Sequence, residues 1–214
     1  KTHMTPANLS SMFHRSIEPS TTSRVLQAMF NQDSFVHHAP LPAGPSFSDE
    51  GAANHTRFCN KYGEPGVALF VYGDDLVDKE AVPKKFPARQ TLPACKAIAR
   101  SHGLSHEKVV YARQNPAAID AGVFHNDVIA VGNQGLLFHH ELAFAKRDEV
   151  YSQLDAAMGR ALDYIEVPST KVSLSDAVRS YLFNSQLLSV PGKSGATLIV
   201  PGECEEVAAV HEYL

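Results

Sequence analysis

Short apolar strands and amphipathic helices recur along this chain in the order strand, strand, helix, strand. In the clearest case, strands at 128–131 and 136–138 are followed by a helix and then by a strand at 164–167. The helix is indicated by an apolar stripe of Val150, Leu154, Ala157 and Ala161. The spacing recurs without matching sequence. We therefore predict an α/β fold of quasi-repeated ββαβ units.

Other segments follow the same scheme. A strand at 67–72 precedes a helix with Leu92, Cys95 and Ala99 on one face, and a strand at 109–112 follows that helix. Nearer the N-terminus, a helix of about three turns is indicated by the stripe Val25, Leu26, Met29 and Phe30. Beyond residue 173, the pattern predicts a helix, a strand at 197–200 and a final helix.

Residues 120–133 form the stretch most typical of a functional site. Here the apolar strand Val128–Val131 is entered directly from a loop that carries His125 and Asp127. On an extended segment, residues i and i+2 point the same way. The sequence therefore predicts that His125 and Asp127 address one ligand together.

The composition limits the class of partner. The 214 residues are 44% hydrophobic and carry a net charge of -4 without a basic stripe, which argues against nucleic acid or a membrane surface and favours a small-molecule ligand. The three cysteines form no CxxC pair, so neither a disulfide framework nor a thiolate zinc site is indicated. No apolar run approaches the roughly 20 residues that span a bilayer. These features predict a cytoplasmic protein.

Both ends of the chain resemble internal sequence. It begins at Lys1 without an initiator Met and stops at 211–214 within a helical pattern that has no C-terminal signal. We therefore expect an internal fragment. Missing units would leave apolar faces uncovered, and such faces would favour a homodimer.

Two further segments bear ionisable groups at site-like positions. In Asp49–His55, small residues surround Glu50, an arrangement that allows close approach of a ligand. The alternative is a capped turn, in which Asp49 or Asn54 satisfies backbone donors. Arg89 lies just before a predicted helix N-terminus, a position that favours binding of a carboxylate, although most single arginines are surface residues.

Five segments carry a family resemblance, in family order along the whole of residues 1–214. They are Ser48–His55, Tyr62–Gly66, Phe86–Thr91, Gly122–Val128 and Tyr181–Leu187. Together they resemble the N-succinylarginine dihydrolases of bacterial arginine breakdown, in the amidinotransferase or pentein superfamily. The resemblance implies a five-bladed α/β propeller of ββαβ modules, of which residues 1–214 would form about three in a single incomplete domain. Family proteins are considerably longer at both ends.

The resemblance also implies a reaction without a cofactor. The guanidinium of N-succinylarginine would be hydrolysed in two rounds to N-succinylornithine, two ammonia and carbon dioxide. Glu50 matches the catalytic acid of the family and His125 its catalytic histidine, whereas Asp127 matches a position that binds the guanidinium. Further family positions that bind substrate are matched by His14, Arg15 and Arg89. We assign the two arginines to the substrate carboxylates.

The nucleophile is where the sequence departs from the family. The family cysteine lies in a Gly-rich segment near the C-terminal end, and nothing here matches it. Cys59, Cys95 and Cys204 are predicted to be packed, unreactive thiols. We therefore predict that these 214 residues alone have no hydrolase activity.

Two other interpretations remain open at the level of sequence. The pairs His37–His38 and His139–His140, with Glu50, His55, His125 and Asp127, could form a metal site of an amidohydrolase. However, neighbouring histidines on a strand face opposite ways, and no HExxH motif is present. The third interpretation is a non-catalytic binding module.

Overall fold

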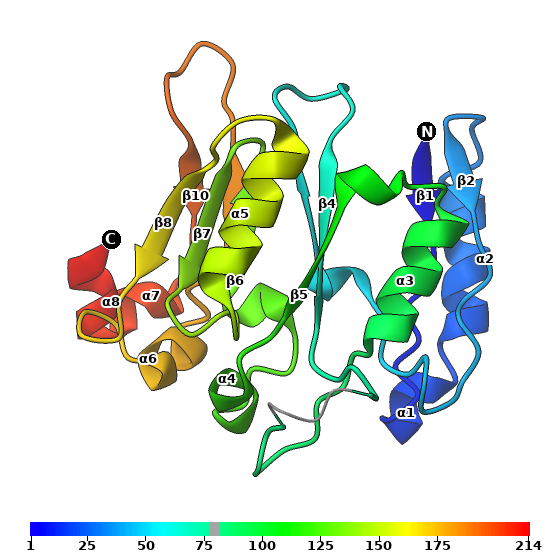
Figure 1. Ribbon diagram of the computed structural model, residues 1–214, viewed down its shortest axis with the longest axis horizontal. Coiled ribbons are helices and arrows are strands. Elements are labelled where there is room, and N and C mark those ends of the chain that lie inside the picture. The colour runs from blue at the N-terminus through cyan, green and yellow to red at the C-terminus, as the bar shows by residue number, and fades with distance from the viewer. Residues whose placement is uncertain (78–81) are drawn as a thin grey trace.

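The structure, a computed structural model, describes residues 1–77 and 82–214. Its first unit is a three-stranded sheet in which β4 lies between β3 and β5. Strands β3 and β4 are antiparallel, whereas β4 and β5 are parallel and are connected through α3 (Figure 1). The bounds are β3 His55–Phe58, β4 Val67–Tyr72, α3 Leu92–Ser101 and β5 Val109–Arg113.

A second unit repeats this arrangement. Strand β7 pairs antiparallel with β6 and parallel with β8, and α5 connects the parallel pair. The bounds are β6 Ala130–Asn133, β7 Leu136–His140, α5 Arg147–Met158 and β8 Asp163–Val167. The predicted α/β class is therefore observed, and the predicted ββαβ unit occurs twice within the described residues.

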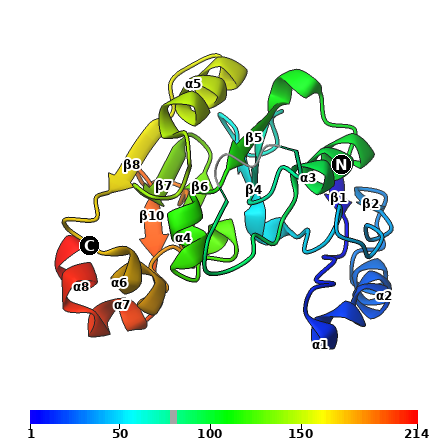
Figure 2. The ribbon, with the colours of Figure 1, turned by 60° about the horizontal axis from the view of Figure 1, so that its bottom comes forward.

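Smaller groups flank the two units. At the N-terminal side, α2 connects two parallel strands, β1 and β2, and at the C-terminal side β9 and β10 are antiparallel. Figures 1 and 2 show these groups at opposite ends of the molecule. Their bounds are β1 Thr2–Met4, α1 Phe13–Ser16, α2 Pro19–Met29, β2 Phe35–His37, α6 Leu174–Arg179, β9 Gln186–Leu188, β10 Thr197–Ile199, α7 Glu203–Glu206 and α8 Ala208–Tyr213. No helix in the described part of the chain is long and apolar enough to cross a membrane.

One hydrophobic cluster joins the two units. It includes Phe58 and Leu69 from the first sheet with Ile129, Leu137 and Leu154 from the second unit, all fully buried. A parallel bridge between Phe58 and Gln134 and a 3.0 Å bond from the Cys59 amide to the Gln134 carbonyl extend the contact to the backbone. We call this β3–β6 contact the seam.

Local sequence explains where the crossover helices begin and end. The Thr91 side chain accepts the Ala94 amide proton at 3.1 Å and so caps α3. Helix α3 then buries one face, including Cys95 and Ile98. Helix α5 ends at Gly159, whose φ of 73° is the left-handed conformation that glycine adopts without a Cβ penalty.

The central strand begins later than predicted. It runs from Ala130, whereas Asn126–Val128 form a 3-10 turn, η3. His125 is extended and Asp127 lies within that turn. The predicted alignment of these two side chains along an extended segment is therefore wrong, because the chain forms a 3-10 turn from Asn126.

Strands β1, β2, β3 and β9 are absent from the sequence-based prediction. Strand β3 reads His-Thr-Arg-Phe, with Phe58 its one apolar residue and also its one buried residue. Its strand conformation comes from pairing with β4, with His55 opposite Phe70 and Phe58 opposite Val67. Tertiary pairing therefore overrides a weak local preference.

Three neighbouring histidine rings, of which His3 and His38 are stacked, connect the N-terminal group to α3. His3 Nδ1 lies 2.8 Å from His38 Nε2, and His102 Nε2 lies 2.8 Å from Thr5 Oγ1. The three ring centroids are 4.9 to 5.2 Å apart. Burial, together with the neighbouring charges of His38, His3 and His55, lowers the pKa of His102 from 6.5 to about 4.

This cluster predicts acid sensitivity. Above pH 6.5 the His102 ring is neutral in both the folded and the unfolded state; between about pH 6.5 and 4 the unfolded chain binds more protons, so stability falls as the pH falls. Because the ring is only half-buried, we expect His102→Gln to recover about 1 kcal/mol of the stability lost between pH 7.5 and pH 5. Urea unfolding at the two pH values measures this, with exposed His106→Gln as the control. Equal losses in His102→Gln and wild type would contradict it.

Candidate active site

The acid loop places Glu50 in the interior. The residue is 2% exposed, and its carbonyl accepts the Asn8 amide proton at 2.9 Å. Its carboxylate accepts a hydrogen bond from His55 Nε2 at 2.5 Å, and the His55 ring packs on Phe70. The imidazole that directly contacts Glu50 is therefore His55, a partner that the sequence analysis did not assign.

Asp49 has a structural role in the same loop. Its carboxylate accepts hydrogen bonds from the backbone amide of Ser11, at 3.0 Å, and from the Ser11 hydroxyl. Its φ of 56° is rare for a residue with a Cβ. Asp49 therefore satisfies a backbone donor, as the alternative expected, but that donor belongs to the distant Ser11 and not to its own turn. The next residue, Glu50, is buried.

His125 is surrounded by the charges predicted for the site. Burial lowers its pKa, the negative charges of Asp127 and Asp49 raise it, and the positive charges of Arg89 and Arg15 lower it. Arg15, Arg89 and Asp127 therefore lie within electrostatic reach of His125. The net lowering favours a neutral imidazole.

The acid loop and the His125 loop meet through Asn54. This residue is 1% exposed and ends η1 (Ala52–Asn54). Its Oδ1 accepts the Asn126 amide proton at 2.8 Å, and its Nδ2 donates to Gln90 Oε1 and lies 3.2 Å from His125 Nδ1. The structure thus brings together two segments that the sequence separates by 71 positions.

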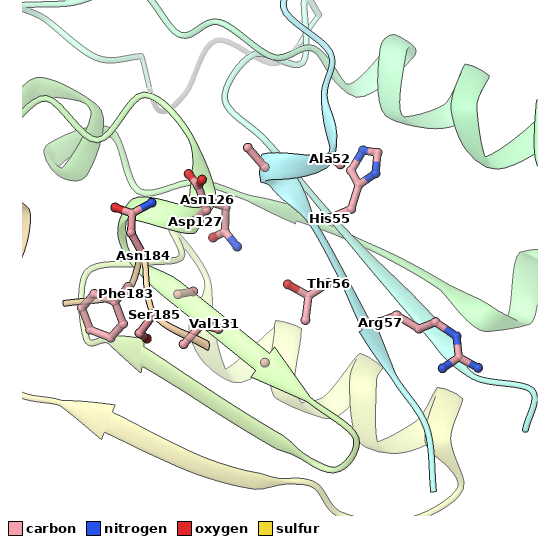
Figure 3. Close-up of a pocket in the computed structure, with 13 residues that line it drawn as sticks. Ala52, His55, Thr56, Arg57, Asn126, Asp127, Val131, Phe183, Asn184 and Ser185 are labelled. Atoms are coloured by element: carbon pink, nitrogen blue, oxygen red, sulfur yellow. The ribbon is translucent and has the colours of Figure 1, made fainter. Parts of the chain in front are cut away.

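Asp127 opens onto a cavity of about 480 Å³ beside the seam. Figure 3 shows Thr56 on one wall and Val131 on the other, with Asp127 and Asn184 at one end. Burial raises the pKa of Asp127, and positive charge on His125 opposes that effect. The remaining lining residues are Ala52, Ala53, His55, Arg57, Asn126, Ala130, Gly132, Phe183 and Ser185.

The other predicted binding residues differ in how they are held. The Arg89 guanidinium carbon lies over the Phe124 ring, 4.2 Å from its centre, in a cation–π contact. Arg15 lies within the short helix α1, directly before α2, and pairs with Glu18 at 2.6 Å on the surface. His14 is exposed on the same short helix and makes no hydrogen bond to the His125 group among the described residues.

Comparison with known protein families matches the family model succinylarginine dihydrolase to residues 1–214. The chain belongs to the succinylarginine dihydrolase family. Similar curated proteins, each named N-succinylarginine dihydrolase, occur in Marinobacter nauticus, 57% identical over 217 residues, and Chromohalobacter salexigens, 58% identical over 207. These alignments cover 100% and 96% of this chain but 48% and 46% of the relatives. The chain therefore spans about half the length of the curated relatives it matches.

The cysteines of this succinylarginine dihydrolase family member are packed thiols. Cys59, Cys95 and Cys204 are each at most 1% exposed and unpaired with one another. Burial raises the pKa of Cys95 to about 12 and also raises the pKa of Cys204. A buried thiol with a raised pKa carries almost no thiolate at neutral pH. The prediction that these cysteines are buried is confirmed.

The histidine pairs suggested for a metal site have other partners. His139 Nε2 lies 2.5 Å from the Tyr151 hydroxyl, whereas His140 Nε2 lies 3.1 Å from the Val172 carbonyl. His37 Nε2 contacts the Phe30 carbonyl at 2.7 Å. Within residues 1–77 and 82–214, no group of three or more His, Cys, Asp or Glu side chains could hold a metal ion.

From sequence, Gln90 has no predicted role, and Asn54 is indicated only as an acceptor of backbone donors, which its bond from the Asn126 amide confirms. Asn54 and Gln90 are both nearly fully buried, and both lie in segments that carry the family resemblance. The sequence signal that could have identified them is their position within Ser48–His55 and Phe86–Thr91. The hydrogen-bond partner of an amide side chain, however, cannot be assigned before the fold is known.

Proposed function

We propose that the longer protein containing these residues hydrolyses the guanidinium of N-succinylarginine to N-succinylornithine, two ammonia and carbon dioxide. The observation that carries the proposal is the contact of Asn54, in the Glu50 loop, with His125 Nδ1 at 3.2 Å and with the Asn126 amide at 2.8 Å. The charges of Asp127, Arg89 and Arg15 also influence the pKa of His125. Family membership across residues 1–214 supports the same conclusion.

In this proposal the carboxylates recognise the reacting group. A guanidinium is a planar cation with five N–H donors, and carboxylates accept such donors in a bidentate geometry. Asp127, at the edge of the cavity, would hold the guanidinium, and Glu50 would polarise it. Substrate binding would restore a charge partner to the half-buried Asp127, whose pKa burial raises.

The remaining residues act on protons and on the anionic end of the substrate. His125 would shuttle protons in each round of hydrolysis. The substrate carries two carboxylates at its succinyl and α-carboxyl groups, and we assign them to Arg89 and Arg15, with His14 beside them. The cation–π contact of Arg89 with Phe124 supports this role because it restricts the position of the guanidinium.

We also propose that the two ββαβ units belong to a five-bladed propeller, with residues 1–214 forming about three modules in one domain. The seam supports this architecture, because β3 of one unit contacts β6 of the next at the edge of the cavity. If each further ββαβ unit contacted its neighbour in the same way, the units would be arranged around a common centre.

The test compares the 214-residue chain with the full-length protein. We expect the full-length protein to release ammonia from N-succinylarginine and the 214 residues alone to release none. The reason is that all three cysteines here are buried, so we propose that the nucleophile lies in the other half of the protein. Purified samples are assayed for ammonia and succinylornithine, with free arginine as the comparison substrate. Turnover by the 214 residues would contradict the assignment of the nucleophile, and an inactive full-length protein would contradict the proposed function.

A further inference from the structure

The orientation of the Asn54 amide is fixed by a donor that cannot change its role. The backbone N–H of Asn126 can only donate, and its acceptor at 2.8 Å is Asn54 Oδ1. The other end of the amide must then be the Nδ2 group, which faces Gln90 Oε1 and lies 3.2 Å from His125 Nδ1. A flipped amide would set two N–H donors against each other.

We propose that Asn54 is a positioning residue that holds His125 as the neutral tautomer with its proton on Nε2. An amide N–H can only donate, so a hydrogen bond to His125 Nδ1 requires that nitrogen to be an unprotonated acceptor. The ring then carries its single proton on Nε2. The inference rests on the proposed function, in which His125 moves protons.

The surroundings of Asn54 are built to keep this arrangement. Asn54 is 1% exposed and Gln90 is 3% exposed, so water does not compete for the amide groups. Gln90 is itself held, because its Nε2 lies 3.6 Å from Cys95 Sγ on the buried face of α3. The network therefore extends from a packed helix to the imidazole.

The same contact opposes a second proton on the ring. A proton on Nδ1 would face the Nδ2–H of Asn54, donor against donor. Burial and the positive charges of Arg89 and Arg15 act in the same direction and lower the pKa of His125, whereas Asp127 and Asp49 raise it. The hydrogen bond from Asn54 and the electrostatic surroundings therefore both favour the neutral His125 ring. In that form, the ring offers Nε2–H as a donor.

Imidazole nitrogen NMR of the full-length protein, with 15N-labelled histidine, tests this directly. The His125 signal is identified by its loss in His125→Gln. We expect a protonated Nε2 and an unprotonated Nδ1 in wild type at pH 7.5. A protonated Nδ1 in wild type would overturn the proposal without any variant at Asn54.

Asn54→Asp supplies the second readout, because a carboxylate accepts from Nδ1–H while keeping an oxygen for the Asn126 amide. We expect the His125 titration to move up by at least about one pH unit, a tenfold change in its protonation equilibrium, and the acid limb of the kcat/KM profile to move with it. Asn60→Asp, which changes an exposed amide bonded to Arg160, is the matched control and should leave both unchanged.

An unchanged His125 titration in folded Asn54→Asp would also overturn the proposal. Because the nitrogen spectrum needs no substrate, failure of the tautomer assignment is distinguished from failure of the proposed hydrolase activity, which the ammonia assay measures separately.

Discussion

Glu50→Gln in the full-length protein is expected to lower kcat/KM for N-succinylarginine by about 10² to 10⁴. Glutamine keeps the shape of the side chain and an oxygen that can accept from His55 Nε2, but it removes the negative charge that would polarise the guanidinium. His125→Asn should cause a loss of similar size, because asparagine cannot carry a proton between reaction steps.

Steady-state ammonia release measures both effects, and Glu64→Gln is the matched control because that side chain is exposed. Glu50 is 2% exposed, so thermal unfolding of each variant separates a chemical effect from a folding defect. Normal turnover in folded Glu50→Gln or His125→Asn would remove that residue from the catalytic group.

Gly66→Ala is expected to lower the free energy of unfolding by about 2 to 3 kcal/mol. A Cβ at Gly66 would lie 2.2 Å from the carbonyl oxygen of Phe58, a backbone atom that cannot rotate away. The strands would have to separate beside the Phe58–Val67 pair that begins the β3–β4 ladder. The loss should therefore include strand pairing as well as the clash.

Urea unfolding gives this free energy, with Gly44→Ala as the control, because a Cβ there meets no atom within 4 Å. Unchanged midpoints for both variants would show that the β3–β4 connection adapts to the methyl group and that the close approach at Gly66 is not required.

The parts of the fold predicted from sequence are those with a dense apolar pattern. Strand β4 and helix α3 were located because each buries a continuous face or stripe, including Leu69 and Ile98. Strand β3 was missed because Phe58 is its one apolar residue, and its conformation depends on a partner strand. Pattern-based prediction fails where tertiary pairing decides the conformation.

The sequence predicted which segments form the candidate site, but not which of their side chains contact one another. The segments that carry Glu50, Arg89 and His125 were identified from their resemblance to a family. The contact of Glu50 with His55, and that of His125 with Asn54, could not be predicted, because each depends on side-chain directions set by strained or 3-10 turns. Local periodicity contains no information on such directions.

The long-range contacts between the two ββαβ units, at the seam and at Asn54, affect the order in which the chain folds. Each ββαβ unit closes through contacts within its own segment, whereas Asn54 and His125 meet across 71 positions. Closing a longer loop costs more chain entropy, so contacts across the seam should follow those within each unit as the chain folds. The acid loop and the imidazole would then come together in a late step, and a chain with two well-formed sheets could still lack a recognition site.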